Sequence, residues 1–374
     1  MIPVSLPCLG GNEWKYAKAC LDSGQLSPGG AFGGRFEQAF AGYTGAKHAL
    51  ACISGSAALH LSLKLLGVQA GDYVLLPNLS APAAAAAISH AGATPILIDA
   101  SPQDWQLDLN LLEGFLGMST LVDDKDDLIL KRDGRRVRAI LAVHFLGNMC
   151  DMERLLFIAR RYHLEVLEDA GEALGSFFGG KHAGTFGRAG VFSFEPGKAI
   201  TAGGGGMIIA GEEELAQRGR RLSGPPGEAD QEEPAYGYRM PELLAAVGLA
   251  QMEQLPGFAE RRKAIGAFYR ERLSGVGDIR FQEAAGGAAP GSLPAAFLTA
   301  RRRELQAYLN AHGIQSSSLP VPANQLPGYR AAIYIRREEQ AARICGQGIS
   351  IPGLPCLSEG QLEEVANRIA TFFS

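Results

Sequence analysis

Short apolar stretches alternate with longer amphipathic ones between residues 49 and 194. The short stretches predict strands at residues 49–54, 73–77, 94–100, 138–147, 164–169 and 191–194. The amphipathic ones predict helices at residues 57–67, 80–92 and 151–163; in the first, Leu59, Leu63 and Leu66 share one face and Gly67 closes the helix. Strands alternating with helices indicate an α/β fold with a mainly parallel sheet covered on both faces. Ligands of such folds bind beyond the carboxyl ends of the strands.

The flanking segments predict a two-domain chain. A helix is expected at residues 12–22, a glycine-rich loop at 25–34, a polar surface excursion at 123–136 and an exposed or mobile Pro- and Gly-rich segment at 222–236. A long helix is expected at 241–273, broken at Pro256. Because residues 275–374 mix short strands, helices and prolines, we expect a large domain at 1–250 and a smaller α+β domain at 251–374.

Composition narrows the class of protein. The chain has 374 residues and a formal charge of -4, so no general attraction to nucleic acid or to an anionic membrane is expected. The start of the chain lacks the pattern of a signal peptide, and no apolar run is long enough to span a bilayer, so we expect a cytoplasmic protein. The six cysteines are scattered without metal-ligand spacing, so we expect reduced, mostly buried thiols and no metal site.

Three places carry candidate chemistry, each with an alternative. Lys198 stands between two apolar runs, before four glycines, and is either a solvated loop residue or an amine held in a pocket to form a Schiff base. Asp169, at the end of a predicted strand, is either a solvated acid or a buried partner for a cation. Gly55 and Ser56 follow Ser54 at a predicted helix start, which is either an ordinary serine cap or an anion site.

The motifs, taken in order, resemble one family. They are SGSAALHLSL, GDYVLLPNLSAPAA, AGATPILIDA, VHFLGNMCDM, LEVLEDAGEALGS, FSFEPGKAITAGGGGM and GYRMPELLAAVGLAQMEQL. This series resembles the DegT/DnrJ/EryC1/StrS nucleotide-sugar aminotransferases from about residue 12 to residue 373. The resemblance implies the type I fold of pyridoxal 5'-phosphate (PLP) enzymes. The polar excursion and the glycine run are most similar to the subgroup acting on UDP-4-keto-6-deoxy-N-acetylhexosamines, of the legionaminic acid and bacillosamine type.

The resemblance also implies a role for each site residue. Lys198 would bind PLP as a Schiff base and move a proton once released, with its pKa lowered by burial and by the cationic ring. Asp169 would keep the pyridine nitrogen protonated. Gly55, Ser56 and Ser193 would hold the phosphate, and Glu172 would lie near the ring, where many relatives have glutamine. The run from Gly203 to Gly206 would let the backbone pass close to the cofactor, unless it only makes a tight turn.

Four positions depart from the family pattern. Ala81 stands where relatives stack an aromatic ring on the cofactor, and Gly237 where an asparagine reaches the phosphate of the neighbouring subunit's cofactor; Ser317 and Asn324 stand in the region of a substrate-binding arginine and histidine. The resemblance implies a nucleotide-linked keto-sugar and glutamate as substrates and a homodimer with shared active sites, for surface polysaccharide or related glycan biosynthesis. The departures leave two alternatives open: a different carbonyl substrate, or a catalytically degenerate binding subunit.

Overall fold

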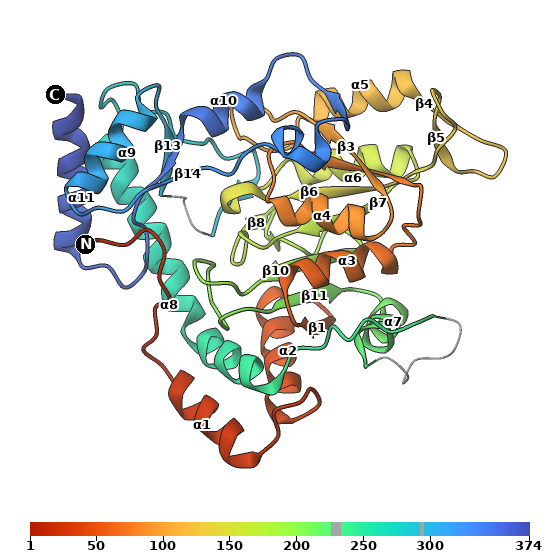
Figure 1. The fold of residues 1–374 in the computed structure, drawn as a ribbon, viewed down its shortest axis with the longest axis horizontal. Helices are drawn as coiled ribbons and strands as arrows, with labels where there is room; N and C mark the ends of the chain where they lie inside the picture. Colours follow the sequence, from red (N-terminus) through yellow and green to blue (C-terminus); the bar gives the residue numbers. More distant parts are fainter. Residues whose placement is uncertain (226–232, 292–294) are drawn as a thin grey trace.

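The computed structural model describes residues 1–225, 233–291 and 295–374, and its centre is an eight-stranded sheet (Figure 1). Strand β11 runs antiparallel to both of its neighbours, β1 and β10, and the other neighbouring strands are parallel. The predicted α/β fold with a mainly parallel sheet is confirmed. In spatial order the strands are β1 (His48–Cys52), β11 (Gly206–Ala210), β10 (Ala189–Ser193), β7 (Glu165–Asp169), β6 (Val137–Val143), β2 (Tyr73–Pro77), β3 (Thr94–Ile98) and β15 (Ile333–Ile335).

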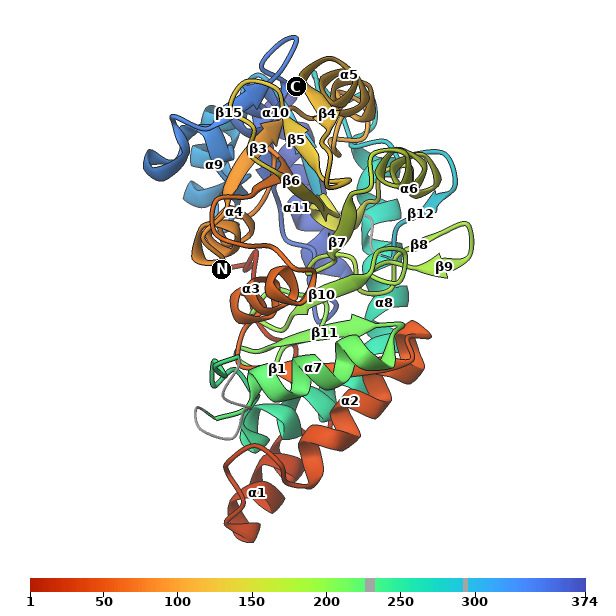
Figure 2. The same ribbon diagram turned by 90° about the vertical axis from the view of Figure 1, so that its right-hand side faces the viewer.

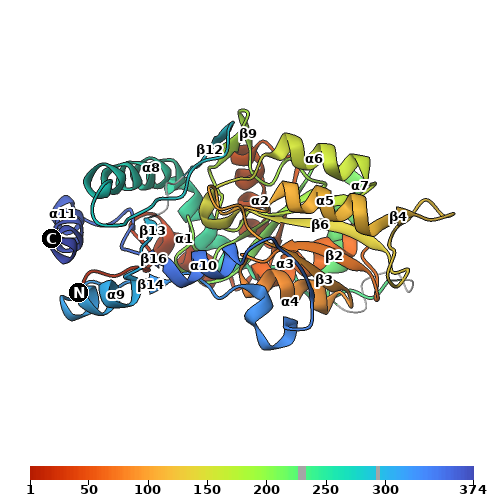
Figure 3. The ribbon, with the colours of Figure 1, turned by 90° about the horizontal axis from the view of Figure 1, so that it is seen from above.

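Helices cover both faces because successive strand residues point to opposite sides (Figure 3). Leu75 and Ile140 point into one core cluster, whereas Leu76 and Leu141 point into the other. The first cluster packs against α2 (Ala31–Thr44), α5 (Leu109–Ser119), α6 (Met152–Arg161) and part of α8 (Glu242–Leu273). The second packs against α3 (Gly55–Leu65), α4 (Pro82–His90) and α7 (Glu213–Ser223).

Two local expectations were wrong, and long-range contacts explain both. The predicted loop at 25–34 instead contains the start of α2 at Ala31, because the buried Glu242 carboxylate accepts hydrogen bonds from the N–H groups of Phe32 (2.7 Å) and Gly33 (3.2 Å). Helix α8 continues through Pro256 instead of breaking there. It packs along α1 (Glu13–Ser23) and α2 (Figure 2), so tertiary packing outweighs the lost hydrogen bond.

The C-terminal part has a core of its own. Its three-stranded antiparallel sheet consists of β13 (Ala296–Leu298), β16 (Gly348–Ser350) and β14 (Ser317–Ser318). Around it lie α9 (Arg302–Ala311), α10 (Gln340–Gln347), α11 (Glu359–Phe373) and the end of α8. The boundary at residue 250 stays a prediction: α8 crosses it, and β15 joins the large sheet beside β3.

The beginning of the chain packs on this C-terminal part (Figure 1). Ile2 is buried in its core and bonds through its backbone to Gly313 and Gln315. Cys8 and Cys356 form a disulfide with their Cα atoms 5.8 Å apart. The expectation of six reduced cysteines was therefore wrong for this pair, which the fold joins across 348 positions of sequence. The other four, Cys20, Cys52, Cys150 and Cys345, are free and buried, as predicted.

Small elements complete the fold. The polar excursion is a hairpin of β4 (Thr120–Val122) and β5 (Leu128–Leu130) that projects from the body, as predicted (Figure 1). A second small sheet contains β12 (Ala288–Ala289), β8 (Phe177–Phe178) and β9 (Lys181–His182), and short 3-10 turns occur at Phe145–Gly147, Ala323–Gln325 and Pro327–Tyr329. The segment at 222–236, expected to be exposed or mobile, falls partly outside the described residues, and its residues 222–224 are buried and not exposed.

Candidate active site

All six predicted site residues line one pocket at the carboxyl edge of the sheet. Asp169 ends β7, Ser193 ends β10, and Glu172 and Lys198 lie in the loops that follow these strands. Gly55 and Ser56 begin α3 on the same side. Parallel strands bring their ends together at one edge, which is why positions up to 143 residues apart in sequence, from Gly55 to Lys198, meet here.

The glycine run forms a tight turn, which is one of the two alternatives that the sequence left open, and its approach to the cofactor stays a prediction. Gly203 and Gly205 adopt positive φ angles of 78° and 104°, so the run forms a tight turn. Gly206 lies so close to the start of α3 that a Cβ atom there would be 2.7 Å from the carbonyl oxygen of Ser54 and 2.8 Å from the Gly55 nitrogen. The turn therefore brings the strand after Lys198 directly against the start of α3.

The start of α3 has the cap and the helix end that an anion site requires. Ser54 caps the helix by accepting a hydrogen bond from the N–H of Ala57 at 3.0 Å. Gly55 and Ser56 precede that bonded position, and their N–H groups belong to the helix end that favours negative charge. A Cβ atom on Gly55 would lie 2.9 Å from the Cβ of Ser193, so only glycine lets this serine approach. These residues fit the phosphate group of PLP.

Lys198 is held by an ion pair with Glu172. Its Nζ lies 3.1 Å from Glu172 Oε1, and the other carboxylate oxygen accepts from the backbone N–H of Leu146 at 2.8 Å. Burial acts to lower the pKa of the Lys198 amine, but Glu172 and Asp169 outweigh it and raise this pKa above its usual range. The expected lowering is therefore not provided by the chain's own groups, which favour the charged amine.

Asp169 lies beside this pair in a different environment. Burial raises its carboxyl pKa, opposed by a hydrogen bond from the N–H of Gly171 (3.1 Å) and by the charge of Lys198. A cationic group against this carboxylate would reverse the effect of burial, as a protonated pyridine nitrogen does. The arrangement fits the ring end of PLP.

A buried His144–Glu168 pair behind Asp169 was not predicted. His144 Nε2 lies 2.8 Å from Glu168 Oε2, and both side chains are fully buried. Glu168 also accepts from the backbone N–H groups of Gly184, Phe186 and Gly187 at 2.7 to 2.8 Å. Burial raises the Glu168 pKa, but these bonds outweigh it, so the net shift is downward. His144 follows β6 and lines the pocket, and its place after a strand end was the available signal.

The four departures from the family pattern fall in different surroundings. Ala81 lines the pocket and offers no ring face. Asn324 makes two 2.9 Å hydrogen bonds with the side chain of Asn78, which occupy its amide oxygen and its backbone N–H. Gly237 has a positive φ of 70°, which disfavours the bulkier residues, and Ser317 is exposed on β14. Of these four positions, Ala81 is the one that lines the pocket of the predicted site residues.

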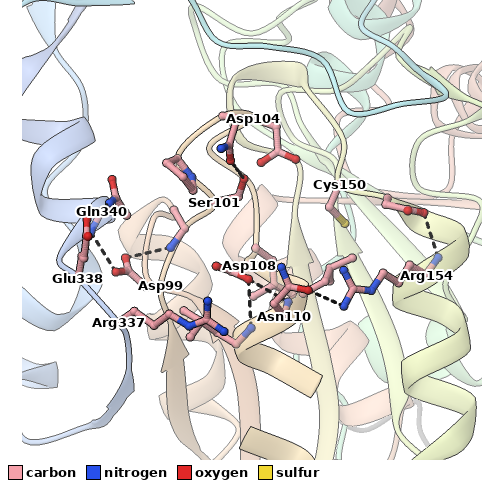
Figure 4. Close-up of a pocket in the computed structure, with 17 residues that line it drawn as sticks. Asp99, Ser101, Asp104, Asp108, Asn110, Cys150, Arg154, Arg337, Glu338 and Gln340 are labelled. Carbon is pink, nitrogen blue, oxygen red and sulfur yellow. Dashed lines mark hydrogen bonds between the residues drawn. The ribbon is translucent and has the colours of Figure 1, made fainter. Parts of the chain in front are cut away.

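A second cavity, of about 480 Å³, lies between the end of β3, α5, α6 and the segment before α10, and contains none of the predicted residues (Figure 4). Acidic side chains in its wall form hydrogen bonds with backbone N–H groups of the fold. Asp99 accepts from the backbone N–H groups of Gln340 and Ala341, and Asp108 caps α5. Arg154 bonds to Asn110 and Glu113. The walls of this cavity come from both parts of the chain, and none of the predicted site residues borders it.

Comparison with known proteins places the chain in a family. The model of the DegT/DnrJ/EryC1/StrS aminotransferase family matches residues 7–370. The chain is 34% identical to a GDP-perosamine synthase of Caulobacter vibrioides, covering 97% of this chain and 96% of that protein. It is 32% identical to a dTDP-3-amino-3,4,6-trideoxy-alpha-D-glucose transaminase of Streptomyces venezuelae, covering 93% and 89%.

A solved structure has the same fold. The crystal structure of DesV from S. venezuelae in complex with a ketimine intermediate matches with a TM-score of 0.87 and 31% identity, covering 97% of this chain and 94% of that one. Within the described ranges, no helix is long and apolar enough to cross a membrane.

Proposed function

The chain belongs to the DegT/DnrJ/EryC1/StrS aminotransferase family and is a PLP-dependent aminotransferase, and we propose that it transfers an amino group from L-glutamate to a keto group of a nucleotide-linked deoxysugar. The family predicted from the motifs is confirmed. The narrower assignment to UDP-4-keto-6-deoxy-N-acetylhexosamines stays a prediction.

One observation carries the proposed chemistry: Lys198, Asp169 and the start of α3 line the same pocket. Bound there, PLP supplies an electron-withdrawing ring that stabilises negative charge on the carbon next to the nitrogen. Lys198 would hold the cofactor covalently and then move a proton at that carbon. Asp169 would hold the proton on the ring nitrogen, while Gly55, Ser56 and Ser193 would bind the phosphate.

The Lys198–Glu172 pair would couple binding to proton transfer. Glu172 lies 3.1 Å from Nζ and favours the protonated amine, and it would hold this amine in the pocket where PLP would bind. Covalent attachment to PLP requires this amine to lose a proton, and the nearby carboxylate of Glu172 is placed to accept it. Glutamate at this position therefore adds an acid–base group that glutamine would lack.

The relatives indicate the chemical class of the amino acceptor but not the individual sugar. The names of the two relatives contain a GDP-sugar and a dTDP-sugar, so we propose a nucleotide-linked sugar and place GDP-linked keto-deoxysugars first. Ala81 lines the pocket without the aromatic ring expected from the family, so the bound cofactor and sugar would make different contacts at this position. A homodimer with shared active sites belongs to the same proposal.

A panel experiment tests the proposal. PLP-loaded protein is incubated with L-glutamate and with GDP-, UDP- and dTDP-linked 4-keto-6-deoxysugars, and the products are identified by mass spectrometry. We expect one nucleotide class to yield an amino sugar and 2-oxoglutarate, and Lys198→Ala to yield neither. If glutamate reacts but none of the sugars does, a different carbonyl acceptor is indicated. If glutamate does not react either, the chain is a degenerate binding subunit.

A further inference from the structure

The pocket lined by the six predicted site residues is called the cofactor pocket below. A third cavity, of about 160 Å³, meets this pocket at the Lys198–Glu172 pair. Both residues line the two cavities, so the pair stands between them. The walls of the third cavity come from the start of the chain, the turn at Leu146, helix α8 and the segment after β16. Gly55, Ser56 and Asp169 line only the cofactor pocket. A small reactant in this third cavity would therefore lie beside Lys198 on the side away from the predicted phosphate site.

Arg262 of α8 lines this third cavity with an incompletely satisfied guanidinium group. Its Nη2 donates a 2.6 Å hydrogen bond to the carbonyl oxygen of Lys198, whereas its buried Nε has no hydrogen-bond partner. No carboxylate among the described residues forms an ion pair with it. Burial lowers the pKa of Arg262 to about 10. A buried cation without an anion is costly, so this arrangement calls for a negatively charged partner.

Arg270, two turns further along α8, is a useful comparison because it is also partly buried but lines none of these cavities. It too is partly buried with an unpartnered Nε. Its guanidinium carbon, however, lies 5.0 Å from the centre of the Phe281 ring, and Nη2 bonds to the carbonyl oxygen of Gln282 at 2.7 Å. Arg270 is thus packed within the fold, whereas Arg262 borders open space beside the reactive lysine.

We propose that Arg262 binds a carboxylate group of the amino donor and so selects amino acids over simple amines. This inference rests on the proposed function, because it assigns a residue to the donor of that reaction. A guanidinium matches a carboxylate in shape and charge. Glu172 and Asp169 supply negative charge near Lys198, where the donor's ammonium group would enter. An amino acid carries both charges and fits a cavity of this size, whereas a nucleotide-linked sugar does not.

Glutarate provides the direct test, since it has the two carboxylates of glutamate but no amine and cannot react. Its affinity for PLP-loaded protein is measured by calorimetry in the wild type, in Arg262→Met and in the matched control Arg270→Met. We expect Arg262→Met to weaken glutarate binding about 10- to 100-fold, the effect of a lost hydrogen bond to a charged group. Arg270→Met should leave this affinity unchanged. Equal affinities in wild type and Arg262→Met, equal losses in both variants, or no glutarate binding at all would overturn the proposal.

Kinetics separate donor binding from mere support of the Lys198 loop. If Arg262 binds the donor, Arg262→Met raises the KM for L-glutamate and leaves the PLP spectrum and the KM for the sugar unchanged. A supporting role alone would instead change the spectrum and lower kcat without a selective change in donor KM, and would overturn the proposal. Should Arg262→Met not fold, Arg262→Lys replaces it; its single ammonium should weaken glutarate binding by about 3- to 10-fold.

The two proposals fail in different ways. If L-glutamate is not the amino donor, PLP-loaded wild type does not convert glutamate to 2-oxoglutarate at all. If only the assignment of Arg262 is wrong, wild type makes 2-oxoglutarate, and glutarate affinity does not depend on residue 262.

Discussion

Replacing Glu168 with glutamine should destabilise the protein strongly without removing any atom that lines the cofactor pocket. The Glu168 carboxylate accepts four hydrogen bonds, from His144 Nε2 and from the backbone N–H groups of Gly184, Phe186 and Gly187. Its side chain is fully buried. Glutamine has nearly the same shape as glutamate, but one carboxylate oxygen is replaced by an NH2 group. This NH2 group cannot accept the hydrogen bonds that the replaced oxygen accepted.

The magnitude follows from this count. On the side with Phe186 and Gly187, or on the side with His144 and Gly184, two donors lose their acceptor. Each buried, unsatisfied donor costs about 1–3 kcal/mol, so for two donors we expect a loss of about 2–6 kcal/mol. Because the folded-state pKa of Glu168 lies below its ordinary value of 4.5, this stabilisation is present above pH 4.5 and lost as the pH falls through the folded-state pKa.

Denaturant unfolding at pH 7, followed by circular dichroism, measures the effect. The matched control is Glu165→Gln on the same strand, which loses half-exposed ion pairs with Arg138 and Arg188 and should cost no more than about 1 kcal/mol. The difference between Glu168→Gln and wild type should also shrink in acid. A loss below about 1 kcal/mol at pH 7, or a loss equal to that of the control, would refute the assignment of Glu168 as a buried, charged anchor behind the site.

Three further predictions follow from individual contacts. Gly55→Ala should weaken PLP binding, measured by titration, because its Cβ would meet that of Ser193 at 2.9 Å, a clash of about 1–3 kcal/mol; Gly204→Ala, with open space around its Cβ position, should have no effect. In Asp169→Asn, Lys198 should still bind PLP, but turnover should fall by about 100-fold or more. Near-normal turnover would exclude Asp169 as the partner of the pyridine nitrogen. Unfolded protein should show four alkylatable thiols before reduction and six after it, and Cys8→Ser should cost about 2–4 kcal/mol; six thiols without reductant would contradict the disulfide.

The sequence predicted those features that depend on local patterns. Strand ends are visible from apolar runs, so Asp169 and Ser193 could be placed at the carboxyl edge of the sheet, and the Ser54 cap could be placed at a helix start. Features set by distant partners could not be predicted. The glycine-rich start of α2 is helical only because Glu242 lies against it, and Cys8 meets Cys356 only in the fold. Arg262 stands in the run Arg261-Arg262-Lys263, which indicates a solvated helix face, and its burial follows from the surrounding structure.

Lys198 is proposed here as the PLP-binding amine of an amino-transfer site, and a single half-reaction tests this role. Purified protein is reconstituted with PLP, its visible spectrum is recorded, and L-glutamate is added without a sugar acceptor. We predict a yellow protein that loses its colour and forms 2-oxoglutarate in an amount equal to the bound cofactor, and a Lys198→Ala variant that does neither. Wild-type protein that stays colourless after reconstitution, or a Lys198→Ala variant that still forms 2-oxoglutarate, would contradict the account.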